Sequence, residues 1–303
     1  MKKLLSLLVV LGMLMSMTGC VTKTSSTTSG SYDNSYCVNG KPSAFLTQLR
    51  KKGVLTVGSS GDEPFAYMDQ SSNTFKGVDA DIIKYVAKKL GIKKVVMKNI
   101  TFSELIINLQ KGNIDMVTDG MYINAERTKK AYFGDIWYKE GAGLLVSKTS
   151  GIKDISDFNP KTTVVGYTPG TAFQNLVESW AKKGLIKEAR STGDQSESIT
   201  ALKYGKINAF VTDTIVLENL FTNEKSAVAG LKLAENYKSD SSVEGSIAPS
   251  VALKNKAFMK EVNNVIKEMR SDGTLDKYMK ANGLNPELHK VAQKDADSGL
   301  NMK

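Results

Sequence analysis

Histidine, cysteine and arginine are scarce in this chain. It has one histidine, His289, and two cysteines. A Ser-His-Asp or Cys-His catalytic group, or a metal site built from several histidines, is therefore close to excluded. Only Arg50, Arg127, Arg190 and Arg270 are arginines, whereas a nucleic-acid-binding protein of this size is expected to use more of them. We therefore expect no catalytic group of these kinds, no metal, no cofactor and no nucleic acid partner.

The composition is that of a globular protein. The 303 residues are 41% hydrophobic and 24% charged, which excludes a largely disordered or fibrous chain and allows one large or two medium domains. The net charge is +10, and the lysines are scattered along the chain. This pattern predicts a solvated surface that favours an anionic membrane or cell wall over nucleic acid.

Residues 1–19 have the pattern of a signal peptide. Lys2 and Lys3 precede an apolar run from Leu4 to Met17. As a helix this run would span about 21 Å, which is short of the hydrocarbon layer of about 30 Å. We therefore expect it to be cleaved and not to remain as a transmembrane helix.

The segment Met17-Thr18-Gly19-Cys20 resembles the lipobox of bacterial lipoproteins, with methionine where leucine is more usual. The resemblance implies cleavage before Cys20, attachment of lipid (palmitate) to this residue, and a place on the outer face of the cell membrane. A plain secretory signal with an incidental cysteine is the alternative. The polar composition that follows predicts a flexible tether over residues 20–43, in which Cys37 has no disulfide partner and no assigned function.

Strand-like and helix-like segments alternate from about residue 44 onward, which indicates an α/β domain. A short apolar run over residues 54–58 predicts the first strand. Asp79 or Asp81 can cap the helix that follows, and Ser103 is expected to cap the next one, which ends at Gly112.

One unit of this pattern occurs twice. The segment Leu109–Asp115 is echoed 93 residues later by Leu202–Asn208, and each reads as a helix end, a glycine and a strand start. Two similarly wound α/β lobes would produce this repeat. In the same register Gly120 corresponds to Asp213, and both are expected just beyond the carboxyl end of a strand, where open α/β sheets bind ligands.

Two crossovers between the lobes are predicted. Residues 143–148 would carry the chain out of the first lobe, and residues 249–253 would bring it back. The boundaries are then 44–145 and 246–290 for the first lobe, 146–245 for the second lobe and 291–303 for a C-terminal tail. The helix with Phe258, Val262, Ile266 and Met269 at helical spacing belongs to the first lobe. Two crossovers make a hinge, so closure around a ligand is the natural motion.

Six motifs between residues 52 and 285 resemble, in order, those of bacterial solute-binding protein family 3, the amino-acid receptors of ABC importers. They are Val57-Gly58 to Pro64-Phe65, Gly77-Val78-Asp79-Ala80-Asp81, Gly112-Asn113-Ile114-Asp115, Gly120 to Arg127, Phe133 to Tyr138, and Asp272-Gly273-Thr274-Leu275. The resemblance implies a two-lobed periplasmic-binding-protein-like fold of type II. It also implies a monomer that binds a polar or cationic amino acid, or a similar zwitterion, and delivers it to an ABC permease in the membrane.

The resemblance assigns the ligand's α-carboxylate to Arg127. A guanidinium suits this role because its fork offers two parallel donors to a planar anion. The surrounding sequence separately predicts a short helix capped by Asn124, which would hold Arg127 on a rigid element. The alternative is a surface arginine paired with Glu126 or Asp135.

Gly170, Thr171 and Ala172 follow a strand-like run over residues 163–166 and precede a helical pattern. A strand, a glycine turn and a helix N-terminus leave free N–H groups that point at one spot, and Thr171 adds a hydroxyl. In the family this turn completes the carboxylate site from the second lobe. An ordinary capped helix is the alternative.

Asp213 follows the apolar run Ala209–Thr212 and matches the family aspartate that holds the ligand's α-ammonium. A carboxylate in a closed cleft is stable only when a cation pairs with it. The alternative is that Asp213 only caps a helix. The resemblance also implies a ligand contact through the backbone carbonyl of Gly120 and one through the N–H of Tyr122.

One position departs from the family pattern, because Tyr122 stands where threonine or serine is usual and would narrow the site. Phe65 and Phe102 match positions that line the family's cleft, and Asp62 or Glu63 stands where an aromatic residue is common. Aromatic faces beside an acid suit a cationic group, which is similar to the sites of receptors for ectoine-like solutes and for basic amino acids. The alternative is that these aromatic residues are simply core.

Two other classes of function remain open. A few proteins of this architecture are exported dehydratases of cyclohexadienyl acids such as prephenate, and an acid among Asp62, Glu63 and Asp119 could protonate a leaving hydroxyl. The lack of a histidine among these groups and the pairing of Arg127 with Asp213 favour a receptor. An adhesin or a sensory accessory protein is not separated from a transport receptor by the sequence, which also does not name the ligand or the permease.

Overall fold

The computed structural model describes residues 32–240 and 243–302. From Asp33 onward they belong to one compact unit. The expected signal peptide and Cys20 lie outside the described residues. Within these ranges, no helix is both long and apolar enough to cross a bilayer.

The first sheet has the strand order β4-β1-β5-β14-β6. Its strands are β1 (Val54–Ser59), β4 (Lys94–Asn99), β5 (Met116–Val117), β6 (Tyr132–Phe133) and β14 (Ser250–Val251). β1 is parallel to β4 and β5, whereas β14 is antiparallel to β5 and β6. Parallel neighbours need crossover connections, which run through α2 (Val78–Lys89) and α3 (Leu105–Lys111).

The second sheet has the order β10-β9-β11-β8-β12. Its strands are β8 (Ala142–Ser147), β9 (Val164–Tyr167), β10 (Glu188–Ser191), β11 (Ala209–Asp213) and β12 (Leu231–Leu233). β9 is parallel to β10 and β11, and β8 is antiparallel to β11 and β12. Both sheets therefore combine a parallel centre with antiparallel strands, and the expectation of an α/β fold with two lobes is confirmed.

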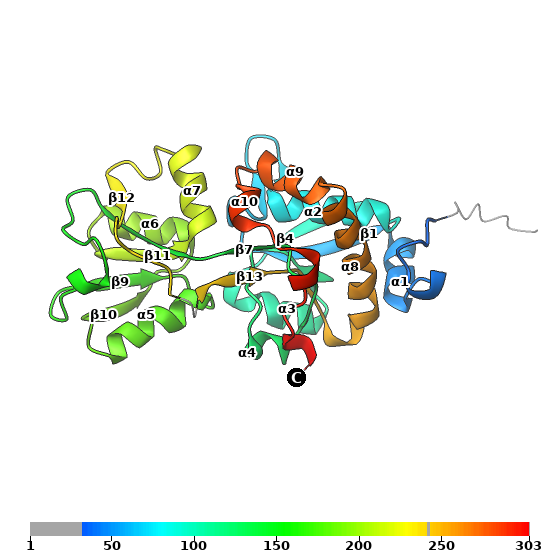
Figure 1. Ribbon diagram of the computed structural model, residues 1–303, viewed down its shortest axis with the longest axis horizontal. Helices are drawn as coiled ribbons and strands as arrows, with labels where there is room; N and C mark the ends of the chain where they lie inside the picture. Colours follow the sequence, from blue (N-terminus) through cyan, green and yellow to red (C-terminus); the bar gives the residue numbers. More distant parts are fainter. Residues whose placement is uncertain (1–31, 241–242, 303) are drawn as a thin grey trace, which may run out of the picture. The chain divides into compact units, whose positions relative to one another are not determined.

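A pair of short strands joins the two sheets. β7 (Tyr138–Glu140) leaves the first lobe, β13 (Gly245–Ile247) returns to it, and the two pair in antiparallel register (Figure 1). The chain is already part of the second sheet at Ala142, where β8 begins. The boundary expected after residue 145 falls inside this strand, because an apolar run by itself does not show with which sheet it pairs.

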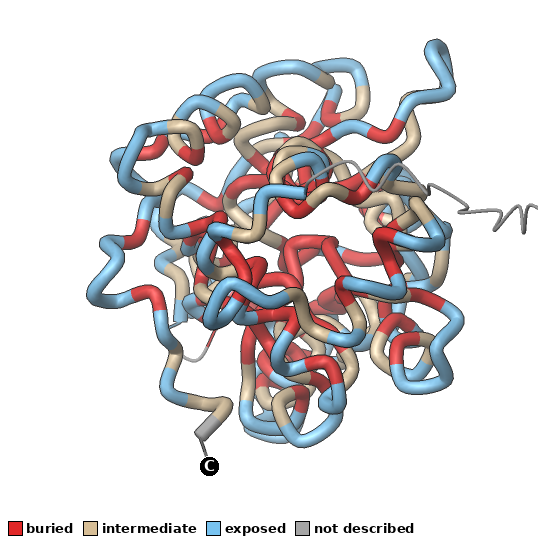
Figure 2. The backbone as a smooth tube through the Cα atoms, turned by 90° about the vertical axis from the view of Figure 1, so that its right-hand side faces the viewer, coloured by how far each residue is buried: buried red, intermediate tan, exposed pale blue. Residues whose placement is uncertain are grey.

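Amphipathic helices cover both sheets. In α8 (Lys256–Ser271) the residues Phe258, Val262, Ile266 and Met269 are fully buried, as their helical spacing predicts. The remaining longer helices are α1 (Ala44–Lys52) and α9 (Thr274–Ala281) in the first lobe, and α5 (Ala172–Lys182), α6 (Gln195–Lys203) and α7 (Thr214–Thr222) in the second. Figure 2 shows the buried segments inside and the outer faces of the helices exposed.

The repeat seen in the sequence has the same geometry in both lobes. The Asp115 side chain accepts a hydrogen bond from the Thr56 N–H at 2.8 Å, and the Asn208 side chain accepts one from the Val164 N–H at 2.7 Å. In each case the helix before it ends at a glycine of positive φ, 75° at Gly112 and 66° in the second copy. The repeat therefore ties a helix end to the second strand of each sheet, β1 in the first and β9 in the second.

Two expected helix caps are wrong. Helix α2 begins after Gly77, and Asp79 does not cap it because its carboxylate turns inward to accept hydrogen bonds from the Gly120 N–H and the Tyr138 hydroxyl. Ser103 lies inside a 3-10 turn over Phe102–Glu104, and α3 starts only after it. Asp81 lies inside α2 and accepts a hydrogen bond from Asn282, so it does not cap the helix either. The carboxylates near the start of α2 thus bond to distant segments, whereas Ser103 is displaced from the cap position by the 3-10 turn that precedes α3.

The flexible tether expected over residues 20–43 is wrong for its last part. Tyr36 and Cys37 are buried, and the Tyr36 hydroxyl donates to Glu268 of α8 at 2.6 Å. Ser43 donates to Glu261 of α8 through both its N–H and its hydroxyl. Tyr36 and Cys37 therefore anchor the end of this segment on the first lobe. The polar average composition of residues 20–43 predicted a flexible tether because it does not register two buried side chains.

The C-terminal segment also packs on the first lobe. The Ile136 N–H donates to the carbonyl of Ala296 at 2.8 Å, and the Asn301 side chain donates to the carbonyl of Phe133 at 2.8 Å. Helix α10 (Pro286–His289) lies against β7. The segment expected as a tail thus covers the edge of the first sheet at β6.

Candidate functional site

A small cavity lies between the two lobes, at the carboxyl ends of the central strands. The first lobe lines it with Asp62, Phe65, Phe102, Asp119, Gly120, Tyr122 and Arg127, and the second lobe with Thr168, Thr171, Ala172, Phe173, Gln195, Thr212 and Asp213. The centre of a water molecule can reach about 30 Å³ of it, and one water needs roughly 10–15 Å³. The two lobes therefore nearly meet here.

Arg127 is held on the short helix α4 (Ala125–Thr128), whose first turn is capped by the side chain of Asn124. Its side chain is buried, and its guanidinium donates to the carbonyls of Tyr122 at 2.6 Å and Gly170 at 2.7 Å. It also lies 5.5 Å from the ring centroid of Phe102. Burial lowers the pKa of Arg127 to about 10, so it is charged at neutral pH.

The alternative of a surface ion pair for Arg127 is wrong. Glu126 instead pairs with Lys129 at 2.6 Å. Asp135 accepts a hydrogen bond from the Asn263 side chain at 2.6 Å and donates one to it through its N–H at 2.9 Å. The predicted cap and short helix are confirmed. The sequence therefore located a buried cation correctly and identified the local structure that positions it.

The turn before α5 approaches the cavity from the second lobe. Gly170 has a φ of 80°, and a Cβ on it would lie 2.8 Å from the Cα of Ser103, so only glycine allows the lobes to come this close. The Thr171 hydroxyl donates to the carbonyl of Thr168 at 2.7 Å and does not cap α5. The first N–H groups of α5 thus remain open to the cavity.

Asp213 stands at the end of β11 and lines the cavity. It occupies the N-cap position of α7, but its side chain makes no capping hydrogen bond, so capping does not account for it. Burial raises the pKa of Asp213 to about 6. Its charge also acts on Arg127, where it opposes the effect of burial and raises the pKa of the guanidinium.

Tyr122 lies across the link between the lobes. A Cβ on Gly245 of β13 would lie 2.2 Å from its ring, and its ring centroid is 5.8 Å from that of Phe173 in the second lobe. Its hydroxyl is buried beside Asp213 without a direct hydrogen bond. Tyr122 thus lines the cavity, and the absence of a side chain at Gly245 makes room for its ring.

Glu140 lies behind Asp213, on the linking strand β7. It is 6% exposed, and neither of its carboxylate oxygens has a hydrogen-bond partner. Burial, and then the charge of Asp213, raises the pKa of Glu140 well above its usual value. Because an isolated buried carboxylate is costly, Glu140 is neutral when no cation is bound nearby.

Ser60 joins two further acids at the other end of the cavity. Its hydroxyl oxygen is 2.7 Å from Asp62 and 2.6 Å from Asp119. A hydroxyl carries one proton, so it donates to only one carboxyl group, and the other contact needs a proton on the acid itself. Burial raises the pKa of both aspartates, and the charge of Asp62 adds to the effect on Asp119.

Side chains of the first lobe support the Gly120 backbone, which lines the cavity. Asp79 accepts from the Gly120 N–H at 2.9 Å and from the Tyr138 hydroxyl at 2.6 Å, and burial raises its pKa to about 6. The ring of Phe65 lies against Gly120, because a Cβ on Gly120 would be only 2.8 Å from it. The same ring is stacked with that of Tyr138, with the two ring centroids 6.3 Å apart. These contacts hold the Gly120 backbone in place beside the cavity.

The comparison with protein families agrees with this geometry. Residues 55–283 match the family described as bacterial extracellular solute-binding proteins, family 3. The chain belongs to this family. The match covers both sheets and the two strands that link them.

Curated relatives of this family 3 protein are described as amino-acid-binding proteins. A glutamine-binding protein of an ABC transporter from Bacillus subtilis is 29% identical over 240 residues, which are 78% of this chain and 83% of that protein. An L-cystine-binding protein from the same organism is 27% identical over 251 residues, 82% of this chain and 88% of the relative. An arginine-binding extracellular protein, also from Bacillus subtilis, is 26% identical over 233 residues, 76% of this chain and 86% of the relative.

Solved structures of related proteins have the same fold. An ancestral arginine-binding protein bound to arginine has a TM-score of 0.67 and 31% identity, over 76% of this chain and 98% of that one. The ancestral amino-acid-binding protein AncCDT-1, described as a precursor of cyclohexadienyl dehydratase, has a TM-score of 0.67 and 29% identity. The match covers 79% of this chain and 100% of that one.

The expected ligand-binding residues of this family 3 protein line the cavity, with two exceptions. Gly170 lies in a groove beside the cavity and contributes its carbonyl to Arg127. Glu63 lies outside the cavity, where burial and then Glu224, two residues after the end of α7, raise its pKa to about 7. The residue after Asp62 therefore faces the neighbouring lobe and not the cavity.

Sequence analysis missed several lining residues. Thr168 and Phe173 flank the predicted turn, and Thr212 precedes Asp213. These residues could have been predicted to line the cavity because they are adjacent in sequence to predicted binding residues. Gln195 had no such signal, because the start of α6 reaches the cavity only through the packing of the second lobe. Glu140 was also missed, since nothing in the local pattern distinguishes a buried glutamate on a linking strand from an exposed one. Among the described residues, no group of acids, histidines and cysteines is arranged to hold a metal ion.

Proposed function

We propose that this protein is the extracytoplasmic receptor of an ABC importer and that its ligand is a cationic amino acid or a similar zwitterion. One observation carries the proposal. A single buried guanidinium, Arg127, shares one cavity with three carboxyl groups, those of Asp62, Asp119 and Asp213. Since unpaired buried charges are costly, the site favours a ligand with one carboxylate and two cationic groups.

Each end of such a ligand has a matching group. Its α-carboxylate would take the Arg127 guanidinium in place of the Gly170 carbonyl, together with the first N–H groups of α5. Its α-ammonium would pair with Asp213. A cationic side chain would then reach Asp62 and Asp119 between the faces of Phe65 and Phe102. The relatives described as binding arginine, glutamine and cystine support an amino acid as the ligand.

Binding requires the lobes to separate and close again, because the cavity now holds only about 30 Å³ of space for water centres. The linking strands β7 and β13 are the natural hinge, since no other described strands connect the two sheets. Four or five charge-assisted hydrogen bonds at roughly 1.5–3 kcal/mol each, less the costs of ordering and closure, leave about 8 kcal/mol. This corresponds to a micromolar dissociation constant.

We further propose that the protein is a monomeric lipoprotein on the outer face of the cell membrane. The signal-peptide pattern of residues 1–19 and the lipobox-like Met17–Cys20 support this assignment. The description of the family as extracellular agrees with it. Globomycin, which blocks cleavage at a lipobox, should make the unprocessed chain accumulate, and Cys20→Ala should abolish labelling by radioactive palmitate.

The function is tested by thermal-shift screening of amino acids, ectoine-like solutes and polyamines, followed by calorimetry. We expect a saturable shift with arginine, lysine or ornithine, and a smaller one with neutral amino acids. Mass spectrometry of what co-purifies with the protein would identify the ligand directly. Turnover of prephenate or arogenate would instead support a dehydratase, and no shift with any of these compounds would contradict both.

A further inference from the structure

Four exposed lysines gather on the first lobe, away from the cavity. They are Lys51 in the last turn of α1, Lys88 in the last turn of α2, Lys93 just before the edge strand β4, and Lys94 at the start of that strand. Lys88, Lys93 and Lys94 line one surface depression. The Lys93 side chain lies against Gly53, because a Cβ on Gly53 would be 3.6 Å from the Lys93 Cδ. Since Gly53 caps the end of α1, Lys93 lies beside that end. We refer to these four residues as the lysine face.

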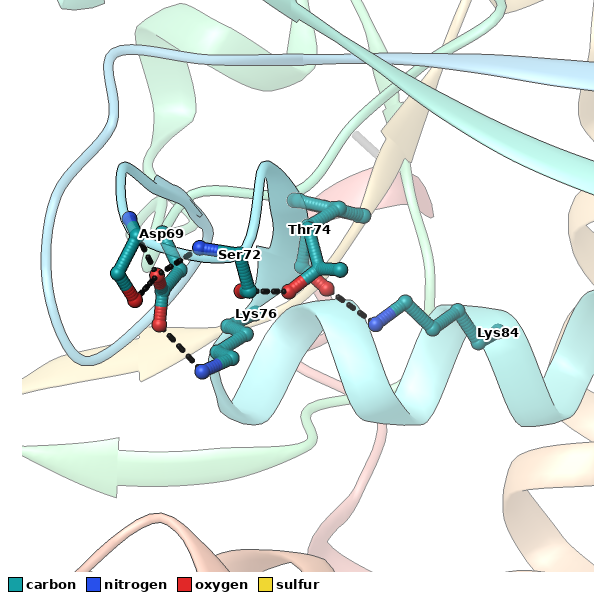
Figure 3. A network of polar contacts seen from close by, with 7 residues as sticks. Asp69, Ser72, Thr74, Lys76 and Lys84 are labelled. Atoms are coloured by element: carbon teal, nitrogen blue, oxygen red, sulfur yellow. Dashed lines mark hydrogen bonds and ion pairs between the residues drawn. The ribbon is translucent and has the colours of Figure 1, made fainter.

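No ion pair is seen for any of the four lysines among the described residues. Their neighbours differ in this respect. Lys52 pairs with Asp115 at 3.0 Å and Lys89 with Glu268 at 2.8 Å. Lys84 reaches the carbonyl of Phe75 in the β2–β3 hairpin (Tyr67–Asp69 and Thr74–Lys76), as Figure 3 shows.

Helix ends explain only part of this arrangement. Lys51 and Lys88 lie in the last turns of helices, where a cation is favourable for the helix itself. Lys93 precedes strand β4 and Lys94 begins it, so neither gains anything from a helix. Four like charges close together repel one another, so their grouping is a cost to the fold that an anionic partner would remove.

The position where the described chain begins points to the kind of partner. Arg50 donates to the carbonyl of Leu90, at the end of α2, at 2.7 Å and to the side chain of Asn34 at 2.8 Å. The N-terminal segment is thereby fixed next to the lysine face, at the end of the molecule that carries α1 in Figure 1. Only residues 21–32 separate it from Cys20, and such a stretch spans at most about 40 Å.

We propose that the lysine face docks on the anionic lipid headgroups of the membrane. Basic residues near an anionic bilayer are attracted to it, and one weak attachment strengthens another when both act on the same molecule. The lipid attachment proposed above would bring the lysine face within reach of the bilayer. Docking would then set the orientation of the first lobe at the membrane. The charge interaction itself does not depend on the lipid or on the identity of the amino-acid ligand.

The test uses residues 33–303, because all the strand pairings and both core clusters of the described residues lie within this unit. Binding is measured by co-sedimentation with vesicles of phosphatidylcholine containing about 30% phosphatidylglycerol, at about 50 mM salt. The variant Lys51→Gln/Lys88→Gln/Lys93→Gln/Lys94→Gln should bind at least about tenfold more weakly. About 0.5 M salt should abolish binding of the unchanged protein.

A matched control removes the same charge from the second lobe. Lys161, Lys182, Lys183 and Lys187 are also exposed, and changing all four to glutamine should leave vesicle binding within about twofold of that of the unchanged protein. Equal losses in the two variants would overturn the proposal, because net charge alone would then explain binding. Binding to pure phosphatidylcholine, or to soluble polyphosphate but not to vesicles, would overturn it as well. An unchanged circular dichroism spectrum shows that the variants fold. Because neither this measurement nor vesicle binding needs the amino-acid ligand, a failure of docking is distinguished from a failure of the receptor assignment.

Discussion

The guanidinium of Arg127 donates to the backbone carbonyl of Gly170 across the gap between the lobes, at 2.7 Å. A group of the first lobe thus contacts the turn that begins the main helix of the second. A ligand carboxylate offers the same guanidinium a charged acceptor, which makes a stronger hydrogen bond than a neutral carbonyl. When a ligand carboxylate replaces the Gly170 carbonyl as acceptor, this hydrogen bond between the lobes is lost. Ligand binding would therefore be coupled to the relative position of the two lobes.

Replacing Arg127 tests this directly. Arg127→Ala should weaken binding of the amino-acid ligand at least about tenfold, because a hydrogen bond to a charged group contributes about 1.5–3 kcal/mol. Calorimetry gives the dissociation constant, and circular dichroism shows whether the fold is kept. Arg190→Ala is the control, since this arginine lies near the surface with Glu188. A native spectrum with an unchanged dissociation constant in Arg127→Ala would reject the assigned role.

The two acids beside Tyr122 should respond differently to removal of their charge. Asp213→Asn removes the partner of the ligand's α-ammonium and should weaken binding at least about tenfold. Glu140→Gln replaces a carboxyl group that is already neutral, so affinity at neutral pH should change less than about threefold. The same calorimetric titration measures both. If Glu140→Gln weakens binding as much as Asp213→Asn, Glu140 is ionised in the complex and holds the ligand itself.

The unliganded protein should be more stable in mild acid than at neutral pH. Asp79 and Asp213 have a pKa of about 6 in the folded protein, against about 3.9 when unfolded. The folded state therefore binds more protons between these values. The stabilisation is complete below about pH 4 and is lost as the pH rises through about 6. Carboxyl groups with lowered pKa, such as those of Asp69 and Glu126, are largely ionised above about pH 5.5 in both states and do not oppose the trend.

Differential scanning calorimetry at constant ionic strength tests whether the stability of the unliganded protein falls as the pH rises. The Tm should fall by a few degrees between about pH 5.5 and 7.5, and less so in Glu140→Gln, which lacks one such acid. A cationic ligand binds the ionised acids, so its affinity should rise over the same interval. A Tm that rises with pH in the unliganded protein would contradict the assignment of neutral buried acids.

Gly245 and Tyr122 should depend on each other. Gly245→Ala places a Cβ 2.2 Å from the Tyr122 ring, which must then shift toward the cavity and weaken ligand binding. In a Tyr122→Thr background the added methyl has room, so the same change should have little further effect. A double-mutant cycle on the dissociation constant measures the coupling. Equal effects of Gly245→Ala in both backgrounds would mean that the glycine matters for the linking strand and not for the ring.

The local features of this protein followed from its sequence. The short helix that carries Arg127, the buried stripe of α8 and the glycine-ended repeat each depend on residues within one or two turns of the chain. The ordered motifs also placed Arg127 and Asp213 on separate lobes that share a cavity. Such features are readable because side-chain spacing and capping act over a few residues.

Only the tertiary structure decided which polar groups are buried and what they meet. Asp79 reads as a helix cap but supports Gly120, and Glu140 has no local signal yet lies unpaired behind Asp213. Likewise, the scattered lysines include four that gather beside the point where the N-terminal segment is held. The physical reason is that burial and charge proximity depend on segments far apart in the chain, whereas periodicity records only neighbours along it.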